Sequence, residues 1–592
     1  MAASTSSLGV EMQNLSLNSK LSCANDSDES GPCQSSGSFA CKECLLIAYC
    51  SKRCQTAHWP THRRDCKSPL MMKTWVPIWE KEDRPRIIVP QDMAFGRLKN
   101  LWGYVPAIDV IKLRENEGGR GRFESSMNLL FAASGDIRNV ILSIVSLPQS
   151  YRGPLNIVIN DVDIDTVARN IIFLLVFFHE EDPVQAAEHV LHIWYSTLLT
   201  ESCHGMLLHK LKPMIKEVCD SISKKPGLAL LGKTWTFGES SLRMVLTRDN
   251  WFILLTYFDV PQGLTEDDAQ LLRQRVMSAP ERIDFVDTIR CMEPPPTRLG
   301  TAKFRSDGMM LPFGQPRKDF KVPNPTLFRS AVEWPMVDNA LPISGWSLKQ
   351  ILDVDIGPAK NDLYGKLYHY LRQLFADFHG RLRSLPAKFD FLHMDARVLP
   401  NHVGGMRFDR IDVNSICEND SFDIDVALKK LGPLLQRPTV NQHATLITFF
   451  QAAVRRVSSV MESIFPPFLL YAVMAERQKK ALQYMPELGR DNSINAVRRG
   501  SALTIFRDLD WIFDEYMRLE DFESAALNAG LQMKSPHTII QPWPLRFSGG
   551  RPTTKTREEF ARLLSSTHNG YERYVEWKVS SVDNVANVEE LN

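Results

Sequence analysis

The sequence predicts an α/β protein, in which a mostly parallel sheet is split by a large helical insertion and preceded by a small cysteine-rich segment. Three observations support this fold class. Apolar runs of strand length recur at 127–161 and again at 391–450, and they end in turns or acidic residues. The periodicity between them, over about residues 181–387, is helical. Seven of the eleven cysteines lie between Cys23 and Cys66.

The cysteine-rich segment predicts two structural zinc sites. With one histidine, its cysteines make eight potential ligands in 44 residues, at Cys23, Cys33, Cys41, Cys44, Cys50, Cys54, His62 and Cys66. Ligand pairs two or three residues apart suit a tetrahedral ion, and eight ligands fill two such ions with no position left for substrate. Reduced structural thiols or a disulfide framework are the alternatives, and a chain without a secretory signal gives disulfides little support.

The residues between the ligands resemble the MYND zinc finger, which the run from Tyr49 to Gln55, then Trp59, His62 and Cys66 match position by position. In that family the pairs interleave. The resemblance therefore assigns one ion to Cys41, Cys44, His62 and Cys66, and the other to Cys23, Cys33, Cys50 and Cys54. The first pair departs from the family's usual Cys-x2-Cys, because nine residues separate Cys23 from Cys33 and Ser30 stands at the close position.

Two strand–turn–helix units follow the finger. Residues 127–133 form an apolar run that breaks at Ser134-Gly135-Asp136 and continues with helical spacing through Val145. Residues 155–161 repeat the arrangement, with Asp165 as the expected N-cap of a helix that runs to Phe178. Two such units in succession predict a parallel sheet.

The later strands are expected at 391–396, 408–414 and 444–450, in the same sheet as the first two. Before them, helices are expected to open at Asp182-Pro183 and to cover 207–222 and 267–276. Segments near 538–547 and 573–579 are expected to add an antiparallel hairpin.

This arrangement resembles the class I S-adenosylmethionine-dependent methyltransferase fold. The resemblance depends on the glycine turn after the first strand, on acidic residues that end the second and third, and on Phe408-Asp409 at the fourth. Acidic side chains at the carboxyl ends of parallel strands face the crevice where ligands bind. The resemblance implies that a cofactor would contact Gly135, Asp136, Asp161 and Asp395.

A closer resemblance is to the family of axonemal dynein assembly factor 3 and to fungal proteins that join a MYND finger to the same uncharacterised domain. It covers roughly residues 95–460. Its motifs are Leu101 to Asp109, Ala133 to Arg138, Ala168-Arg169, Leu311 to Gly314, and Phe408 to Ile411.

Catalysis has little support in the sequence, and no catalytic residue is assigned. The turn after the first strand has one glycine, where a working methyltransferase usually has several. After the fourth strand the chain reads Asn414-Ser-Ile-Cys417, and the Asn-His-Ser-Cys signature of SET-domain enzymes is absent. We therefore expect an intracellular adaptor whose finger binds protein partners, including Pro-rich peptides. The alternatives are an S-adenosylmethionine-dependent methyltransferase and, third, a transcriptional co-regulator.

Composition gives no indication of a nucleic-acid or membrane partner. The net charge is +1 over 592 residues, which gives no global footprint for nucleic acid or an anionic membrane. The longest apolar run has eight residues, Ile171 to Phe178, against about 20 needed to span a bilayer. Without a signal peptide, the chain is expected in the cytoplasm or nucleus. The expected organisation is a disordered tail at 1–22, a finger at 23–67, a linker at 68–94, and a methyltransferase-like domain at 95–592.

Overall fold

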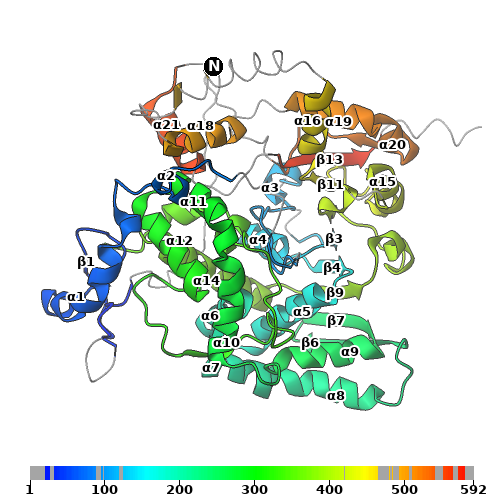
Figure 1. Ribbon diagram of the computed structural model, residues 1–592. Helices are drawn as coiled ribbons and strands as arrows, with labels where there is room; N and C mark the ends of the chain where they lie inside the picture. Colours follow the sequence, from blue (N-terminus) through cyan, green and yellow to red (C-terminus); the bar gives the residue numbers. More distant parts are fainter. Residues whose placement is uncertain are drawn as a thin grey trace, which may run out of the picture.

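A computed structural model of the chain describes residues 21–26, 32–87, 95–97, 99–118, 124–418, 421–464, 479, 483–484, 493–505, 510–540, 551–564 and 571–580. The predicted disordered tail lies outside these residues except for Leu21 and Ser22. The small N-terminal finger lies at one side of a much larger α/β domain (Figure 1).

A nine-stranded sheet forms the centre of the large domain, in the order β12-β13-β11-β10-β3-β4-β9-β7-β6. Its five central strands are the five predicted from sequence, and all four pairings among them are parallel. They are β3 (Met127–Ala132), β4 (Leu155–Asp161), β9 (Ala387–His393), β10 (Arg410–Val413) and β11 (Thr445–Phe450). The prediction of one largely parallel sheet is confirmed, although β9 begins and ends a few residues earlier than expected.

Antiparallel strands complete the sheet beside β11. The predicted strand at 573–579 is present as β13 (Arg573–Val579), which pairs with β11, and β12 (Leu531–Met533) pairs with β13. The predicted partner segment at 538–547 was wrong where it is described: residues 538–540 form no strand, and their backbone amides donate to the buried Glu576 carboxylate. The remainder of that segment, 541–547, lies outside the described residues.

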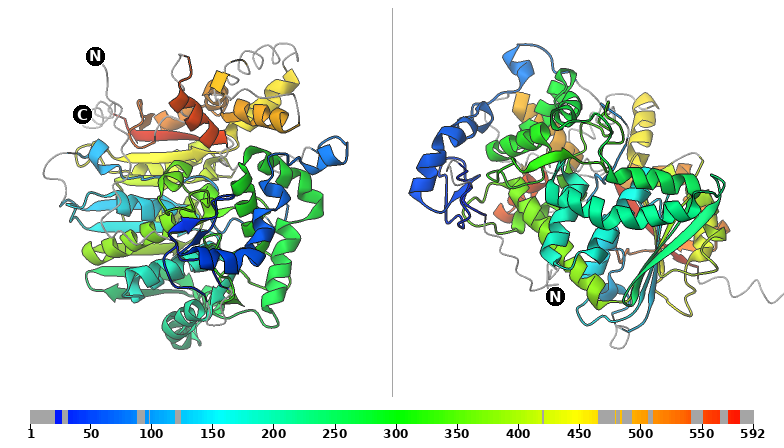
Figure 2. Two further views of the ribbon diagram at one scale, coloured as in Figure 1. Left: turned by 90° about the vertical axis from the view of Figure 1, so that its left-hand side faces the viewer. Right: turned by 90° about the horizontal axis from the view of Figure 1, so that it is seen from below.

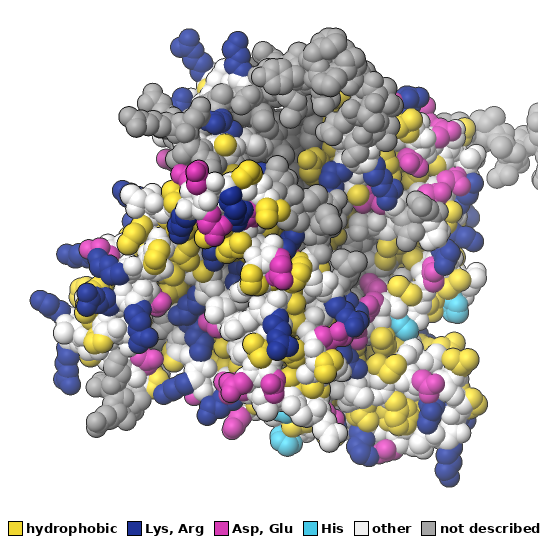
Figure 3. All heavy atoms as spheres, viewed as in Figure 1, with side chains coloured by type: hydrophobic (Ala, Val, Ile, Leu, Met, Phe, Trp, Pro, Cys, Tyr) yellow, Lys and Arg dark blue, Asp and Glu magenta, His cyan; other side chains and the backbone are white. Residues whose placement is uncertain are grey.

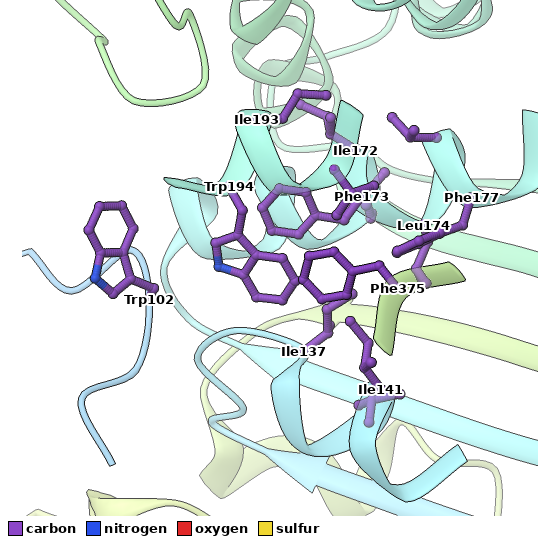
Figure 4. Packing of buried hydrophobic residues seen from close by; sticks show 14 of the residues in the cluster. Trp102, Ile137, Ile141, Ile172, Phe173, Leu174, Phe177, Ile193, Trp194 and Phe375 are labelled. Carbon is purple, nitrogen blue, oxygen red and sulfur yellow. The ribbon is translucent and has the colours of Figure 1, made fainter. Parts of the chain in front are cut away.

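Helices cover both faces of the sheet because successive strand residues point to opposite sides. Phe131 and Ile157 pack with α4 (Arg138–Ser146), α5 (Ile164–His179), α6 (Pro183–Tyr195) and α14 (Leu363–Ser384). On that face, Trp194 stacks on Phe375 at 5.5 Å between ring centroids (Figure 4). Leu130 and Val158 pack on the other face with α15 (Ile424–Leu431), α19 (Asp510–Leu519) and α20 (Phe522–Asn528).

The region 181–387 is not purely helical, which corrects the predicted insertion. Strands β6 (Leu230–Phe237) and β7 (Ser240–Thr247) form a hairpin that extends the main sheet through a parallel β7–β9 pairing. β5 (Leu198–Thr200) and β8 (Phe320–Pro323) form a separate antiparallel pair. The main helices of the region, besides α6 and α14, are α8 (Lys212–Ile222), α9 (Arg248–Leu255), α10 (Glu266–Met277), α11 (Ile283–Met292), α12 (Pro295–Asp307) and α13 (Leu348–Asp353).

The stretch predicted as a linker packs against the large domain where it is described. Its short helix α2 (Ile78–Lys81) begins with an amide that donates to Asp287 at 2.7 Å. Arg84 then pairs with Asp284 at 2.7 Å. Both acidic residues lie on α11, so this segment is held against the helices of the large domain, and Figure 2 shows the finger beside that domain from two further sides.

No helix within the described ranges is both long and apolar enough to cross a membrane. Acidic and basic side chains are interspersed over the large domain, whereas Lys and Arg gather over the finger (Figure 3).

Candidate metal centre and sheet crevice

The finger consists of a short hairpin followed by one helix. β1 (Phe39–Ala40) pairs with β2 (Ala48–Tyr49), and α1 (Lys52–Cys66) follows directly. The hydroxyl of Ser51 caps α1 by accepting a hydrogen bond from the Cys54 amide at 3.3 Å. The hairpin turn carries Cys41 and Cys44, while the first and last turns of α1 carry Cys54 and the His62/Cys66 pair.

The eight candidate ligands meet in two groups of four. One group is Cys23, Cys33, Cys50 and Cys54, and the other is Cys41, Cys44, His62 and Cys66. Within each group the ligand atoms lie within 4.8 Å of one another. The structure thus gives the same division as the MYND resemblance, with Cys23 in its group despite the long first spacing.

The distances fit tetrahedral zinc. Two sulfurs each about 2.3 Å from one ion should be about 3.8 Å apart, and a sulfur and an imidazole nitrogen about 3.6 Å apart. The Cys41 and Cys66 sulfurs are 3.8 Å apart, as are those of Cys33 and Cys50. The Cys44 sulfur lies 3.5 Å from Nε2 of His62. Both clusters therefore fit a zinc ion, with no fifth side chain needed.

The thiols within each group also shift one another's pKa values. Burial raises the pKa of Cys23 to about 12 and the pKa of Cys66 to about 11. A hydrogen bond from Cys44 lowers the pKa of Cys41 to about 3 and raises that of Cys44 in turn. Closely packed thiols therefore share protons in the metal-free chain, and a bound ion would replace those protons.

The group around Cys44 is shielded from solvent by the large domain. Its four ligands are buried, with Cys44 at 0% exposure. Leu299 from α12 and Phe313 from the following loop belong to the finger's own apolar cluster. Leu21 and Ala48 pack likewise against Ile356 and Ala359 of the large domain. The finger is therefore docked, and the large domain supplies part of its core.

The predicted cofactor residues lie at the carboxyl edge of the sheet, near the point where chain order reverses between β3 and β10. Asp161 accepts hydrogen bonds from the amides of Gly135 and Asp163, both at 2.9 Å. Burial raises the pKa of Asp161. Asp161 therefore holds the turn after β3, in which Ala133 and Gly135 have positive φ angles.

Asp136 and Asp395 are paired with arginines instead of facing a common cavity. The Asp136 carboxylate lies 2.7 Å from Nε of Arg138 and accepts from the Gly103 amide at 2.8 Å. Asp395 caps its own 3-10 helix and lies 2.6 Å from Arg397, which lowers the pKa of Asp395. The sequence correctly places these residues at strand ends, but the structure brings only Gly135 and Asp161 into direct contact.

A segment of the chain itself crosses the start of α4. The amides of Gly103, Ile108 and Val110 donate in turn to Asp136, just before the helix, and to Asn139 and Ser143 on it. Arg138 donates to the carbonyls of Val105 and Gly345. A side chain at position 103 would overlap the guanidinium of Arg138. The polar groups that a ligand would use at this end of α4 are therefore bonded to residues 103–110.

Comparisons with known proteins give two local matches. Residues 23–66 match the MYND finger family. Residues 101–199 match a domain of unknown function, DUF4470, which includes β3, α4, β4, α5 and the crossing segment. No curated protein and no solved structure matches the chain. The comparisons give no support for a relation to methyltransferases or to dynein assembly factors.

Sequence reasoning missed Arg138 and Asn361 as residues that connect distant segments. Arg138 ends the motif Ala133 to Arg138 named above, but its partners Val105 and Gly345 are remote from it in sequence. Asn361 contacts the finger across more than 300 residues, and no local pattern marks it.

Proposed function

We propose that the protein is an adaptor in which a two-zinc MYND finger binds protein partners and the large α/β domain holds the finger in place. Zinc would be held by Cys41, Cys44, His62 and Cys66 in one site, and by Cys23, Cys33, Cys50 and Cys54 in the other. Every position around each ion is then a protein side chain, so the metals stabilise a surface and supply no chemistry.

The observation that carries this proposal is that the polar groups at the carboxyl edge of the sheet form hydrogen bonds within the chain itself. A cofactor would need the turn after β3 and the start of α4, and there Asp136 is bonded to Gly103 and Arg138. Asp161 is bonded to two backbone amides. S-adenosylmethionine would therefore have to displace internal hydrogen bonds before making its own, which costs binding free energy.

The alternative function, a methyltransferase, is favoured by strand order. Numbered along the chain, the five predicted strands lie in the order 3-2-1-4-5, the arrangement of doubly wound nucleotide-binding sheets, with antiparallel β13 beside the fifth. We propose a methyltransferase-like ancestry for the large domain on this basis. Shared ancestry of a fold does not by itself carry activity.

Calorimetric titration of the zinc-loaded protein with S-adenosylmethionine separates these two functions. We expect no saturable heat. Saturable binding at micromolar concentration that is lost in Asp161→Ala, and retained in the control Asp390→Ala, whose side chain on β9 is 37% exposed, would establish the methyltransferase alternative and refute the adaptor proposal.

A second experiment tests the finger as the binding surface. Phe39 on β1 is 61% exposed and is not a candidate metal ligand, so Phe39→Ala should leave the zinc sites intact. We expect this variant to lose captured proteins, or Pro-rich peptides from an array, that the wild type retains. Leu228→Ala removes a side chain that is 85% exposed on the large domain, and it should change nothing. Equal loss in both variants would contradict a finger-specific role.

A further inference from the structure

The turn that carries Cys41 and Cys44 contains a residue in an unfavourable backbone conformation. Leu45 has a φ of +54°, a left-handed conformation that glycine adopts easily and a side-chain-bearing residue does not. The Leu45 amide donates to the Cys41 carbonyl at 2.9 Å, and the next amide, of Leu46, donates to the Cys44 sulfur at 3.4 Å. The positions of two ligands therefore depend on a strained turn, which must be stabilised by its surroundings.

Asn361 of the large domain donates twice to that turn. Its backbone amide bonds the Leu45 carbonyl at 3.0 Å, and its Nδ2 bonds the Cys44 carbonyl at 3.0 Å. Asn361 directly precedes Asp362, the N-cap of α14, whose carboxylate accepts from the Gly365 and Phe313 amides. Asn361 is therefore held at the start of α14, which packs on the sheet. It also lies next to the residue that binds the loop of Phe313, and Phe313 belongs to the apolar cluster of the finger.

The loop at Gly314 of the large domain lies in close contact with the finger. A Cβ at Gly314 would lie 2.9 Å from Ile47 Cγ2 and 3.0 Å from the Ala24 Cβ. Both contacts are tighter than Cβ atoms ordinarily make, so a side chain at position 314 would force the loop or the finger to shift, and glycine allows the loop to lie this close.

We propose that Asn361 is a positioning residue for the zinc site of Cys41, Cys44, His62 and Cys66, so that docking of the finger on the large domain slows the release of the ion from this site. The proposal rests on the zinc-binding function proposed above. The site of Cys23, Cys33, Cys50 and Cys54 has no such donor from the large domain among the hydrogen bonds of the described residues, and it serves as an internal reference.

The test measures metal release from the full-length protein into a chromogenic chelator. Asn361→Asp keeps the size of the side chain and removes its N–H donor, while Asn361→Ala removes both. We expect release from the Cys44 site to become about fivefold faster, the factor for one hydrogen bond of ordinary strength, with the other site unchanged. Cobalt substitution tells the sites apart, because three-sulfur, one-nitrogen and four-sulfur coordination give different visible spectra.

Matched variants distinguish an effect of docking on zinc release from a general loss of stability. Gln274→Ala removes a side-chain amide bond to a carbonyl, that of Ser306, within the large domain, and it should not change either rate. Gly314→Val removes no hydrogen-bonding group and pushes the finger away from the large domain, so it should accelerate release from the Cys44 site even if Asn361→Ala folds poorly. The added side chain also meets Ala24 beside Cys23, so the two sites are compared with each other only in the Asn361 variants. Leu45→Gly relieves the strained turn, so Asn361→Asp should have a smaller effect in that background.

The possible outcomes distinguish the role of Asn361 from zinc binding itself. A wild type without two equivalents of zinc would refute zinc binding itself. Two equivalents with unchanged release in both Asn361→Asp and Gly314→Val would refute the coupling and leave zinc binding intact. Equal acceleration of both sites in Asn361→Asp would also overturn it, because only the Cys44 site receives the Asn361 hydrogen bonds.

Discussion

Replacing Arg138 by Met should strongly destabilise the large domain, because Arg138 connects the crossing segment to the sheet. Its side chain is 11% exposed and that of its partner Asp136 is 4% exposed. The change leaves the Asp136 carboxylate buried without its counter-charge, and the carbonyls of Val105 and Gly345 lose their donor. Breaking a buried pair from one side costs about 3–5 kcal/mol. Urea unfolding of the zinc-loaded protein measures this loss of unfolding free energy.

The chain offers a matched control, since Asp395 and Arg397 form the same carboxylate–guanidinium pair two residues apart. There the side chains are 41% and 49% exposed, so Arg397→Met should cost less than about 1 kcal/mol. Adding Asp136→Asn to Arg138→Met should recover part of the loss, because the buried charge is removed. A loss below about 1 kcal/mol in Arg138→Met would refute the reasoning and would indicate a crevice filled by solvent.

Three further outcomes are expected. Treatment with a strong chelator should release two equivalents of zinc and unfold the finger while most of the large domain stays folded, because eight ligands surround few core residues; elemental analysis that finds one equivalent or none contradicts this. Cys44→Ser should unfold the finger and also lower the melting temperature of the large domain by about 2–4 °C, because Leu299 and Phe313 lose their packing partners; an unchanged melting temperature would show that docking is weak. Burial raises the pKa of Asp412 to about 6, so the stability contributed by its protonated form is complete below about pH 4 and is lost as pH rises through 6. Asp412→Asn should therefore be more stable than the wild type at pH 7.5, by at most about 3 kcal/mol, and equal to it at pH 4 in thermal scans; a constant difference across this range would contradict the assigned cause.

The central strands were predictable because both of their faces are buried. A strand covered by helices on each side is apolar at most consecutive positions, so β3, β4 and β11 appear in the sequence as mostly apolar runs with few polar residues. The zinc ligands were predictable for a different reason. Their spacing along the chain is set by the geometry of one ion, and that spacing is local.

The hairpin β6–β7 was missed although it carries a local signal. Leu242, Met244 and Leu246 are buried and alternate with more exposed neighbours along β7, and Gly238 with positive φ marks the turn. Surrounding helical periodicity outweighed that alternation. The linker prediction failed for a different reason. No pattern in the sequence between 68 and 94 indicates that α11 supplies the partners of Ile78 and Arg84.

The contacts that decide function are the ones that sequence patterns cannot supply. Asp136 was expected to face a cofactor, and a carboxylate at that position is equally suited to a ligand amine or to an internal guanidinium. Only the position of the segment 103–110 distinguishes these two roles, and it depends on hydrogen bonds between groups more than 30 residues apart.

Docking of the finger also determines which of its surfaces a partner can reach. Leu299, Phe313 and Asn361 cover the side of the finger that faces the large domain. Phe39 is exposed, as are Lys52, Arg53, Arg63 and Arg64 of α1 and Lys67 directly after it, and Figure 3 shows Lys and Arg side chains gathered over the finger. A finger held in one orientation loses less rotational freedom when it binds than a tethered one. In the adaptor proposed above, the docked finger would present one surface to its partner, and the large domain would contribute to affinity through the orientation that it imposes.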